Sequence, residues 1–188
     1  AEHLQKYKGR VVFRGDAVKD ESGFYAVFTE QGASASQMAA AKFLDVISRM
    51  PGMSGEAGDA VSAYTQVMLK DAARLLKLEE QDCPETWISL PRSRRPKHWD
   101  SIEDPVVPLE CNLYGHPLAS LLWERHMEEI LLELGWEKVK GWECLYLHRE
   151  SQLFLSVYVD DFKMVGKAEF LKPMWATLRK KIVWGRMY

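Results

Sequence analysis

The sequence contains few cysteines, no long apolar run and no large excess of either charge. Its three cysteines, Cys83, Cys111 and Cys144, form no CxxC pair, which indicates free thiols in a reducing compartment and not a disulfide framework. No apolar run reaches the ~20 residues that a membrane-spanning helix needs, and no signal peptide begins at Ala1. We therefore expect an intracellular protein that is not secreted and has no membrane partner.

The charge is nearly balanced overall but uneven along the chain. A formal net charge of −2 at pH 7 argues against wholesale non-specific binding to nucleic acid. Basic residues nevertheless gather in three stretches, at Lys6–Arg14, Arg92–His98 and Arg179–Lys181. Each stretch alone is compatible with an ordinary solvated surface. Cys144 and His148 are four residues apart with no second ligand pair nearby, so they are a weak signal for zinc.

Sequence periodicity divides the chain into the short strands and helices of an α+β protein. The segment KYKGRVVFRG (6–15) alternates like a strand with a basic row on one face, and FYAVF (24–28) could pair with it as a hairpin. Further strands are expected where short apolar runs end in turn residues, over 86–91, 142–149, 152–158 and 162–166. Helical spacing predicts helices over 36–50, 119–134 and 168–182.

Two segments are expected to be irregular. Residues 53–58, MSGEAG, are rich in glycine and resemble a connection, and residues 91–108 hold four of the eight prolines, which is typical of a surface loop or insertion. With 188 residues of which 47% are hydrophobic, the chain can bury a core as one domain or one two-lobed unit. It begins without Met and ends at Tyr188, so we expect a piece of a polyprotein or a truncated reading frame.

An adjacent pair of carboxylates, Asp160 and Asp161, stands between two apolar strand-like runs in LSVYVDDFKMVG. Asp is common in tight turns, so a simple hairpin turn is one interpretation. The other is a metal site, because a cation relieves the repulsion between two carboxylates and hard oxygen ligands suit magnesium. Asp59, far earlier in the chain, could supply another carboxylate. Carboxylates from two segments can hold two magnesium ions that act in nucleotidyl transfer.

Five landmarks occur in a recognisable order: KGRVVFRG (8–15), DAVSAY (59–64), LYG…W (113–123), LLELGW (131–136) and LSVYVDD (155–161). In this order they resemble the reverse transcriptases of copia-type LTR retrotransposons, and the resemblance runs from about Lys8 to Ile182. It implies a fingers and palm fold, in which an antiparallel sheet carries the YVDD hairpin and packs on helices. The fingers would be about residues 1–50 and the palm 51–188, with a loop insertion near 91–108 and no thumb.

The resemblance also implies roles for individual residues. The catalytic carboxylates would be Asp59, Asp160 and Asp161, which with the carbonyl of Ala60 would hold two Mg²⁺ ions, or Mn²⁺. Tyr64 matches an aromatic gate that excludes the 2′-hydroxyl of ribonucleotides, and a core aromatic is the alternative. The triphosphate would be bound by Lys8, Arg10 and Arg14. The template and nucleotide would lie near Tyr114 and Gly115, and the primer end near Tyr158 and Val159.

The implied partners are an RNA template, a DNA or RNA primer and deoxynucleoside triphosphates. The rest of a Pol polyprotein, with thumb, RNase H and integrase, would lie outside this chain, which would work in a cytoplasmic virus-like particle or in the nucleus. Leu118 stands where the family has a glutamine that contacts the template. An inactive retroelement remnant that at most binds nucleic acid is therefore an alternative, and a magnesium-dependent phosphohydrolase is a weaker one.

Overall fold

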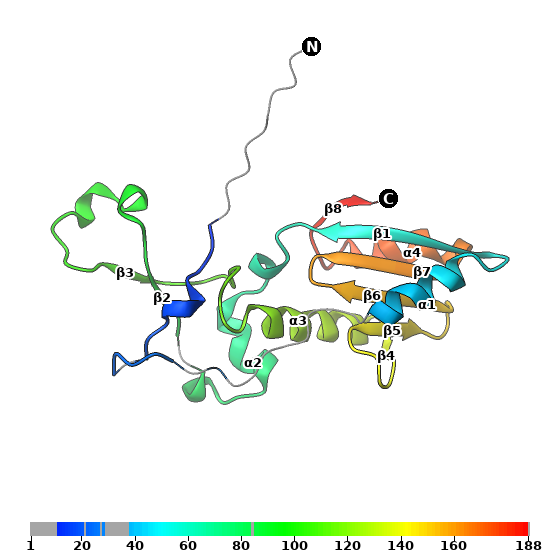
Figure 1. The fold of residues 1–188 in the computed structure, drawn as a ribbon, viewed down its shortest axis with the longest axis horizontal. Coiled ribbons are helices and arrows are strands. Elements are labelled where there is room, and N and C mark those ends of the chain that lie inside the picture. Colours follow the sequence, from blue (N-terminus) through cyan, green and yellow to red (C-terminus); the bar gives the residue numbers. More distant parts are fainter. Residues whose placement is uncertain (1–10, 21, 27, 29–37, 84, 188) are drawn as a thin grey trace, which may run out of the picture.

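The computed structural model describes residues 11–20, 22–26, 28, 38–83 and 85–187, and it has mixed α/β architecture. A six-stranded sheet has the order β4-β5-β6-β7-β1-β8 (Figure 1), and every pairing in it is antiparallel. Its strands are β1 (Met53–Ala60), β4 (Glu137–Lys138), β5 (Leu145–His148), β6 (Leu153–Tyr158), β7 (Asp161–Lys167) and β8 (Trp184–Met187). A separate two-stranded ribbon consists of β2 (Trp87–Ser89) and β3 (Val106–Pro108).

Helices pack on both faces of the large sheet because alternate strand residues point to opposite faces. Phe162 and Met164 of β7 belong to the main core, which also contains buried residues of α3 (Ala119–Glu133) and α4 (Ala168–Leu178). Val165, on the other face, packs in a smaller core with residues of α1 (Met38–Ser48). The short helix α2 (Ala72–Leu76) adds Ala72 and Leu75 to the main core.

The hairpin of apolar strands and the long helix that follows LYG are present as the sequence predicts. Strands β6 and β7 pair from Leu153–Gly166 to Tyr158–Asp161, with no register shift. The last helix, α4, ends at Leu178, before the predicted end at 182. Among the described residues, no helix has the length and the apolar character that crossing a bilayer requires.

The expected hairpin of fingers strands is wrong for the residues that the structure describes. Residues 11–14 form no strand, and Gly15–Ala17 form a short 3₁₀ helix. The segment 24–28 contributes one isolated bridge, between Lys19 and Tyr25. The backbone N–H of Phe13 donates instead to the carbonyl of Tyr114, at 2.7 Å, so a tertiary contact replaces the predicted strand pairing. Lys6, Lys8 and Arg10 lie outside the described residues.

The glycine-rich segment 53–58 is a strand and not the predicted connection. It forms most of β1, which lies between β7 and β8 in the large sheet. Its glycines lie where neighbouring side chains leave little room. A Cβ atom at Gly55 would lie 3.2 Å from Val165, and one at Gly58 would lie 3.2 Å from the Trp175 ring. Small residues therefore fit the close packing of this strand, whereas the sequence pattern alone indicated a connection.

Candidate functional site

The strand register brings together carboxylates that are distant in the sequence. Asp59 on β1 lies directly opposite Asp161 on β7, and Asp161 in turn lies directly opposite Tyr158 on β6. Residues directly opposite each other in an antiparallel sheet project from the same face. Asp59, Asp161 and Tyr158 therefore form a row across three neighbouring strands, at the end of the hairpin. Tyr158 is 54% exposed, so solvent reaches this row.

The turn that carries Asp160 is held from two sides. Val159 and Asp160 connect the paired residues Tyr158 and Asp161, and Val159 has a φ of +53°, a costly conformation for a β-branched residue. The indole N–H of the buried Trp123 on α3 donates to the carbonyl of Val159, at 2.7 Å. The N–H of Ala60 donates to the carbonyl of Asp160, also at 2.7 Å. Both β1 and α3 thus fix the turn.

The electrostatics of this row favour a cation. Partial burial raises the pKa of the Asp161 carboxyl above its usual range, and the nearby charges of Asp160 and Asp59 raise it further. Among the described residues, the ion pairs of the molecule include none with Asp59, Asp160 or Asp161. The row is therefore a concentration of negative charge without a protein cation beside it.

The oxygen donors of this site suit a hard cation, but they do not surround one. All the side-chain donors are carboxylate oxygens, which suit magnesium or manganese. In the described part of the chain, no group of three or more His, Cys, Asp or Glu residues is arranged to hold a metal ion. Asp59, Asp160 and Asp161 are thus close enough to interact electrostatically without forming a closed cage. Magnesium commonly binds one or two carboxylates and completes its shell with water and phosphate oxygens.

Tyr64 lies in the main core. It is 9% exposed, its hydroxyl lies 3.0 Å from the hydroxyl of Ser120, and its ring packs on Tyr114 with centroids 4.6 Å apart. It belongs to a 3₁₀ helix, Ala63–Gln66, that follows β1 after Ser62. These contacts give Tyr64 a structural role in joining the DAVSAY and LYG segments.

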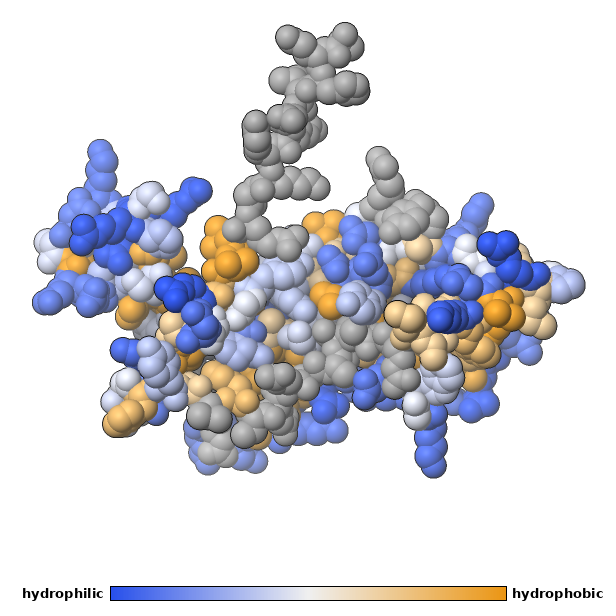
Figure 2. Space-filling view, viewed as in Figure 1, coloured by the Kyte–Doolittle hydropathy of each residue, from blue (hydrophilic) through white to orange (hydrophobic). Residues whose placement is uncertain are grey.

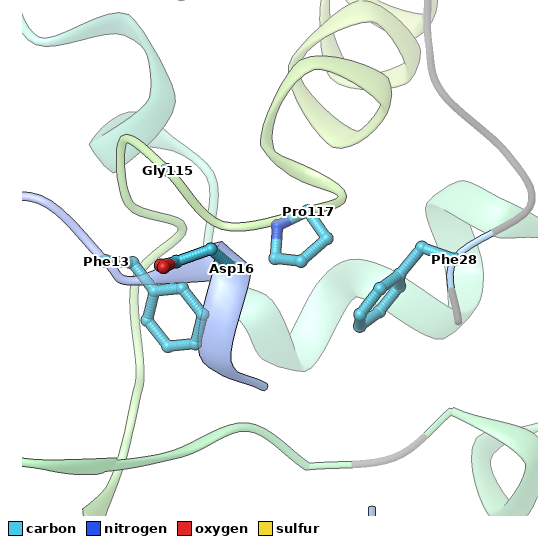
Figure 3. A pocket seen from close by; sticks show the side chains of 6 residues that line it. Phe13, Asp16, Phe28, Gly115 and Pro117 are labelled. Atoms are coloured by element: carbon cyan, nitrogen blue, oxygen red, sulfur yellow. The ribbon is translucent and has the colours of Figure 1, made fainter. Parts of the chain in front are cut away.

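The LYG segment forms one wall of a hollow. Gly115 has a φ of +89°, and a Cβ atom there would lie 2.1 Å from the carbonyl oxygen of Phe13, so the two backbones pack in direct contact. Figure 3 shows the side chains of Phe13, Asp16, Phe28 and Pro117 around the hollow. Its volume is about 420 Å³, and its lining is completed by the glycines at positions 15 and 115.

Arg14, the one predicted triphosphate ligand within the described residues, lies next to this hollow. Its guanidinium forms a 3.0 Å ion pair with Asp16, and this pairing raises the pKa of Arg14 and lowers that of Asp16. Sequence reasoning missed Asp16 and Phe13 as site residues. For Phe13 the apolar face of the alternating segment was a usable signal, whereas nothing in the sequence distinguished Asp16 from an ordinary loop acid.

In the described part of the chain, Cys144 and His148 belong to no group of three or more metal-ligating side chains. Burial raises the pKa of the Cys144 thiol to about 12, so the thiol stays protonated at neutral pH. The Nδ1 atom of His148 accepts a 3.2 Å hydrogen bond from the N–H of Ser151. Cys83, Cys111 and Cys144 form no disulfide among the described residues.

Sequence comparison relates part of the chain to known polyproteins. No protein-family model matches the chain. Over 90 residues, or 47% of the chain, it is 29% identical to the truncated transposon Ty1-A Gag-Pol polyprotein and to the transposon Ty1-DR5 Gag-Pol polyprotein of Saccharomyces cerevisiae. These similarities support a retrotransposon origin. The matched segment spans only 7% of the first of these relatives and 5% of the second.

Among solved structures, the chain is similar to telomerase from Candida albicans in complex with a TWJ fragment of telomeric RNA. The sequence identity is 10% and the TM-score is 0.46, over 83% of this chain and 32% of that one. A similarity at this level does not define the fold family.

Proposed function

We propose that the chain is the fingers and palm part of a copia-type reverse transcriptase, which transfers deoxynucleotides to a primer 3′-hydroxyl on an RNA template. The observation that carries the proposal is the register of β1 and β7, which sets Asp59 opposite Asp161 beside the turn that holds Asp160. The ordered sequence landmarks and the similarity of part of the chain to Gag-Pol polyproteins add support.

In this proposal Asp59, Asp160 and Asp161, with the carbonyl of Ala60, hold two Mg²⁺ ions or, alternatively, Mn²⁺. Bound ions of this kind favour deprotonation of the attacking hydroxyl and stabilise the departing pyrophosphate. The protein residues hold the carboxylates in place, and substrate phosphates would complete a donor set that the protein leaves open. The pKa of Asp161, raised by burial and by its acidic neighbours, fits a site that gains from a bound cation.

The substrate contacts in this proposal follow from the resemblance of the sequence to reverse transcriptases. The exposed Tyr158, with Val159, would lie beside the primer end, and the hollow next to Gly115 would lie near the template and nucleotide. Arg14 would leave its ion pair with Asp16 and bind the triphosphate instead. A gate role for Tyr64 would require its ring edge to reach the nucleotide while its hydroxyl stays near Ser120. Lys8 and Arg10 remain expected triphosphate ligands outside the described residues.

The proposal implies an RNA template, a DNA or RNA primer, deoxynucleoside triphosphates and the remaining Pol domains as partners. Primer extension on an RNA template with magnesium tests it. Wild-type protein should extend the primer, and Asp59→Asn and Asp160→Asn should each lower the rate at least about 100-fold, because loss of even an outer-shell partner of a metal costs 10–100-fold. Glu150→Gln, a change at an exposed acid in the turn between β5 and β6, is the matched control. Equal nucleotide incorporation by wild type and Asp160→Asn would refute the assigned role of Asp160 as a catalytic carboxylate.

A second candidate is an inactive retroelement remnant that binds nucleic acid. The open donor set favours it, since the described residues contain no group of three metal-binding side chains. Leu118 favours it too, because an aliphatic side chain cannot donate a hydrogen bond to a template. Nucleic-acid binding without extension would support this candidate, and pyrophosphate release without templated extension would indicate a phosphohydrolase instead.

A further inference from the structure

The β2–β3 ribbon extends away from the six-stranded sheet and ends in a long tip of residues 90–105 (Figure 1). We infer that this ribbon is a binding surface for single-stranded nucleic acid, with basic residues of the tip contacting phosphates and Trp87 stacking on a base. This role goes beyond the proposed chemistry, because it needs none of the carboxylates at the YVDD turn.

The basic half of the tip is built from two consecutive turns, each preceded by a proline. Pro91 precedes the 3₁₀ helix Arg92–Arg94, and Pro96 precedes the 3₁₀ helix Lys97–Trp99. The N–H of Arg94 donates to the carbonyl of Pro91 at 2.8 Å, and the N–H of Trp99 donates to the carbonyl of Pro96 at 2.9 Å. Proline fixes φ at each turn, so the basic side chains start from a backbone of defined shape.

Arg95 connects the basic tip to one face of the ribbon. Its Nε donates to the carbonyl of Leu90 at 2.8 Å, and its Nη2 donates to the hydroxyl of Ser89 at 3.0 Å. Ser89 and Trp87 are two residues apart on β2 and therefore project from the same face. The guanidinium of Arg95 thus lies on the face that carries Trp87.

That face is unusually apolar for an exposed ribbon. Trp87 pairs with Pro108 and Ser89 pairs with Val106 across the two strands. Trp87 is 53% exposed and Val106 is 51% exposed. The indole N–H of Trp87 donates to a carboxylate oxygen of Glu85 at 3.2 Å, which anchors one edge of the ring and leaves the tryptophan largely open to solvent. An exposed, anchored aromatic beside basic side chains is the combination that binds single strands through stacking and phosphate contacts.

The basic side chains at the tip are available for a ligand. Arg92, Arg94 and Lys97 are exposed, and within the described ranges none of them forms an ion pair. Figure 2 shows a strongly hydrophilic lobe over the tip at the upper left. The acids of the tip, Asp100, Glu103 and Asp104, follow the basic residues in sequence, so the two signs are segregated along the loop.

Fluorescence anisotropy with labelled oligonucleotides over a range of salt concentrations tests the inference. Wild-type protein should bind oligo(U) RNA and oligo(dT) DNA more tightly than a duplex of the same length. The triple variant Arg92→Gln, Arg94→Gln, Lys97→Gln should bind single strands roughly tenfold or more weakly at low salt, with the slope of log K against log salt reduced by about 2. The matched control neutralises three exposed lysines on the body, Lys140→Gln, Lys172→Gln and Lys180→Gln, and should bind nearly as wild type does.

A further variant and the choice of conditions separate this surface from other roles. Trp87→Ala should weaken binding to RNA and DNA single strands but leave binding to heparin unchanged, because heparin has no bases to stack. Oligonucleotide binding is measured without divalent metal and without nucleotide, so a failure of the polymerase proposal would leave this result standing. Thermal unfolding of each variant confirms that it is folded.

Three results would overturn the inference. One is equal affinity of the tip triple variant and the body triple variant for single strands. Another is equal or tighter binding of duplex and of heparin, which would indicate general attraction to polyanions. The third is tight binding of polyglutamate without binding of either oligonucleotide, which would assign the tip to an acidic protein partner.

Discussion

The indole N–H of Trp123 and the backbone carbonyl of Val159 form a 2.7 Å hydrogen bond that joins helix α3 to the turn of the YVDD hairpin. Trp123 is 1% exposed, so this bond is made away from competing water. Val159 itself has a φ of +53°, a conformation that persists only where the surroundings impose it. The helix that follows the LYG segment therefore helps to determine where the Asp160 carboxylate stands.

Replacement of Trp123 by Phe should destabilise the protein more than the same change at Trp136. Both tryptophans are 1% exposed, but in the described part of the chain the indole N–H of Trp136 has no hydrogen-bond partner. Loss of the Trp123 bond leaves the Val159 carbonyl unsatisfied, which costs about 1–3 kcal/mol. Urea unfolding measures the difference. Equal losses for Trp123→Phe and Trp136→Phe would show that the bond contributes nothing.

Asp161→Asn should stabilise the folded protein at neutral pH in the absence of divalent metal. The pKa of Asp161 is raised by burial and by Asp160 and Asp59, so folding stability falls as pH rises through that pKa. Removing the charge restores stability on the order of 0.5 kcal/mol, a small value because the carboxyl is exposed and screened. Thermal unfolding should show the gain at pH 7 and its disappearance once the acids are protonated. A gain that persists at low pH would contradict the electrostatic explanation.

Gly115→Ala should be much more harmful than Gly141→Ala. Both glycines have positive φ, +89° and +81°, but a Cβ atom at Gly115 would lie 2.1 Å from the Phe13 carbonyl oxygen, whereas one at Gly141 meets nothing within 4 Å. The control therefore carries only the left-handed backbone cost of about 1 kcal/mol, and Gly115→Ala must also separate residues 11–17 from the LYG turn. Limited proteolysis at Arg14 should accelerate in Gly115→Ala only. Unchanged protection there would refute the backbone contact.

Stability should fall as pH drops below about 6.5, because of His116. Burial lowers the pKa of His116 from 6.5 to about 4. Its Nδ1 accepts from the N–H of Leu118 at 3.2 Å, so in the neutral ring Nε2 carries the proton toward the Thr86 hydroxyl, 3.1 Å away. When folding lowers a histidine pKa, the resulting stability is fully present above the pKa of the unfolded state. It is lost as the pH falls from that pKa to the pKa of the folded state, here by up to about 3 kcal/mol. His116→Gln should flatten this part of the profile, while the exposed His98→Gln should not.

Local sequence patterns were sufficient to predict the hairpin of β6 and β7 and the helix α3. The apolar alternation on either side of Asp160 predicted the hairpin, and the helical spacing of leucines after LYG predicted α3. Over the described residues 11–14 the predicted fingers strand is absent, and the N–H of Phe13 donates to the carbonyl of Tyr114. Alternation does not encode this tertiary contact. The prediction of a connection over 53–58 was wrong because the glycines of this segment pack against Val165 and Trp175, which come more than a hundred residues later.

The candidate site was predictable in its members but not in its geometry. The order of the sequence landmarks singled out Asp59 and Asp161, yet their direct opposition depends on the register of β1 against β7. No local sequence pattern indicated that Trp123 contacts the turn, because its indole N–H donates to the backbone carbonyl of Val159 and every residue has such a carbonyl. Tyr64 was assigned either a gate or a core position, and its contacts place it in the core.

The close approach of Trp175 to Gly58 has a consequence for how sequence variation reaches the candidate site. The indole ring of α4 rests against the β1 backbone one residue before Asp59, with no side chain between them. A change in the size or tilt of that ring shifts the main chain that carries the carboxylate. Under the proposed function, selection for altered metal preference should therefore recover substitutions in α4, which packs on the sheet face opposite Asp59.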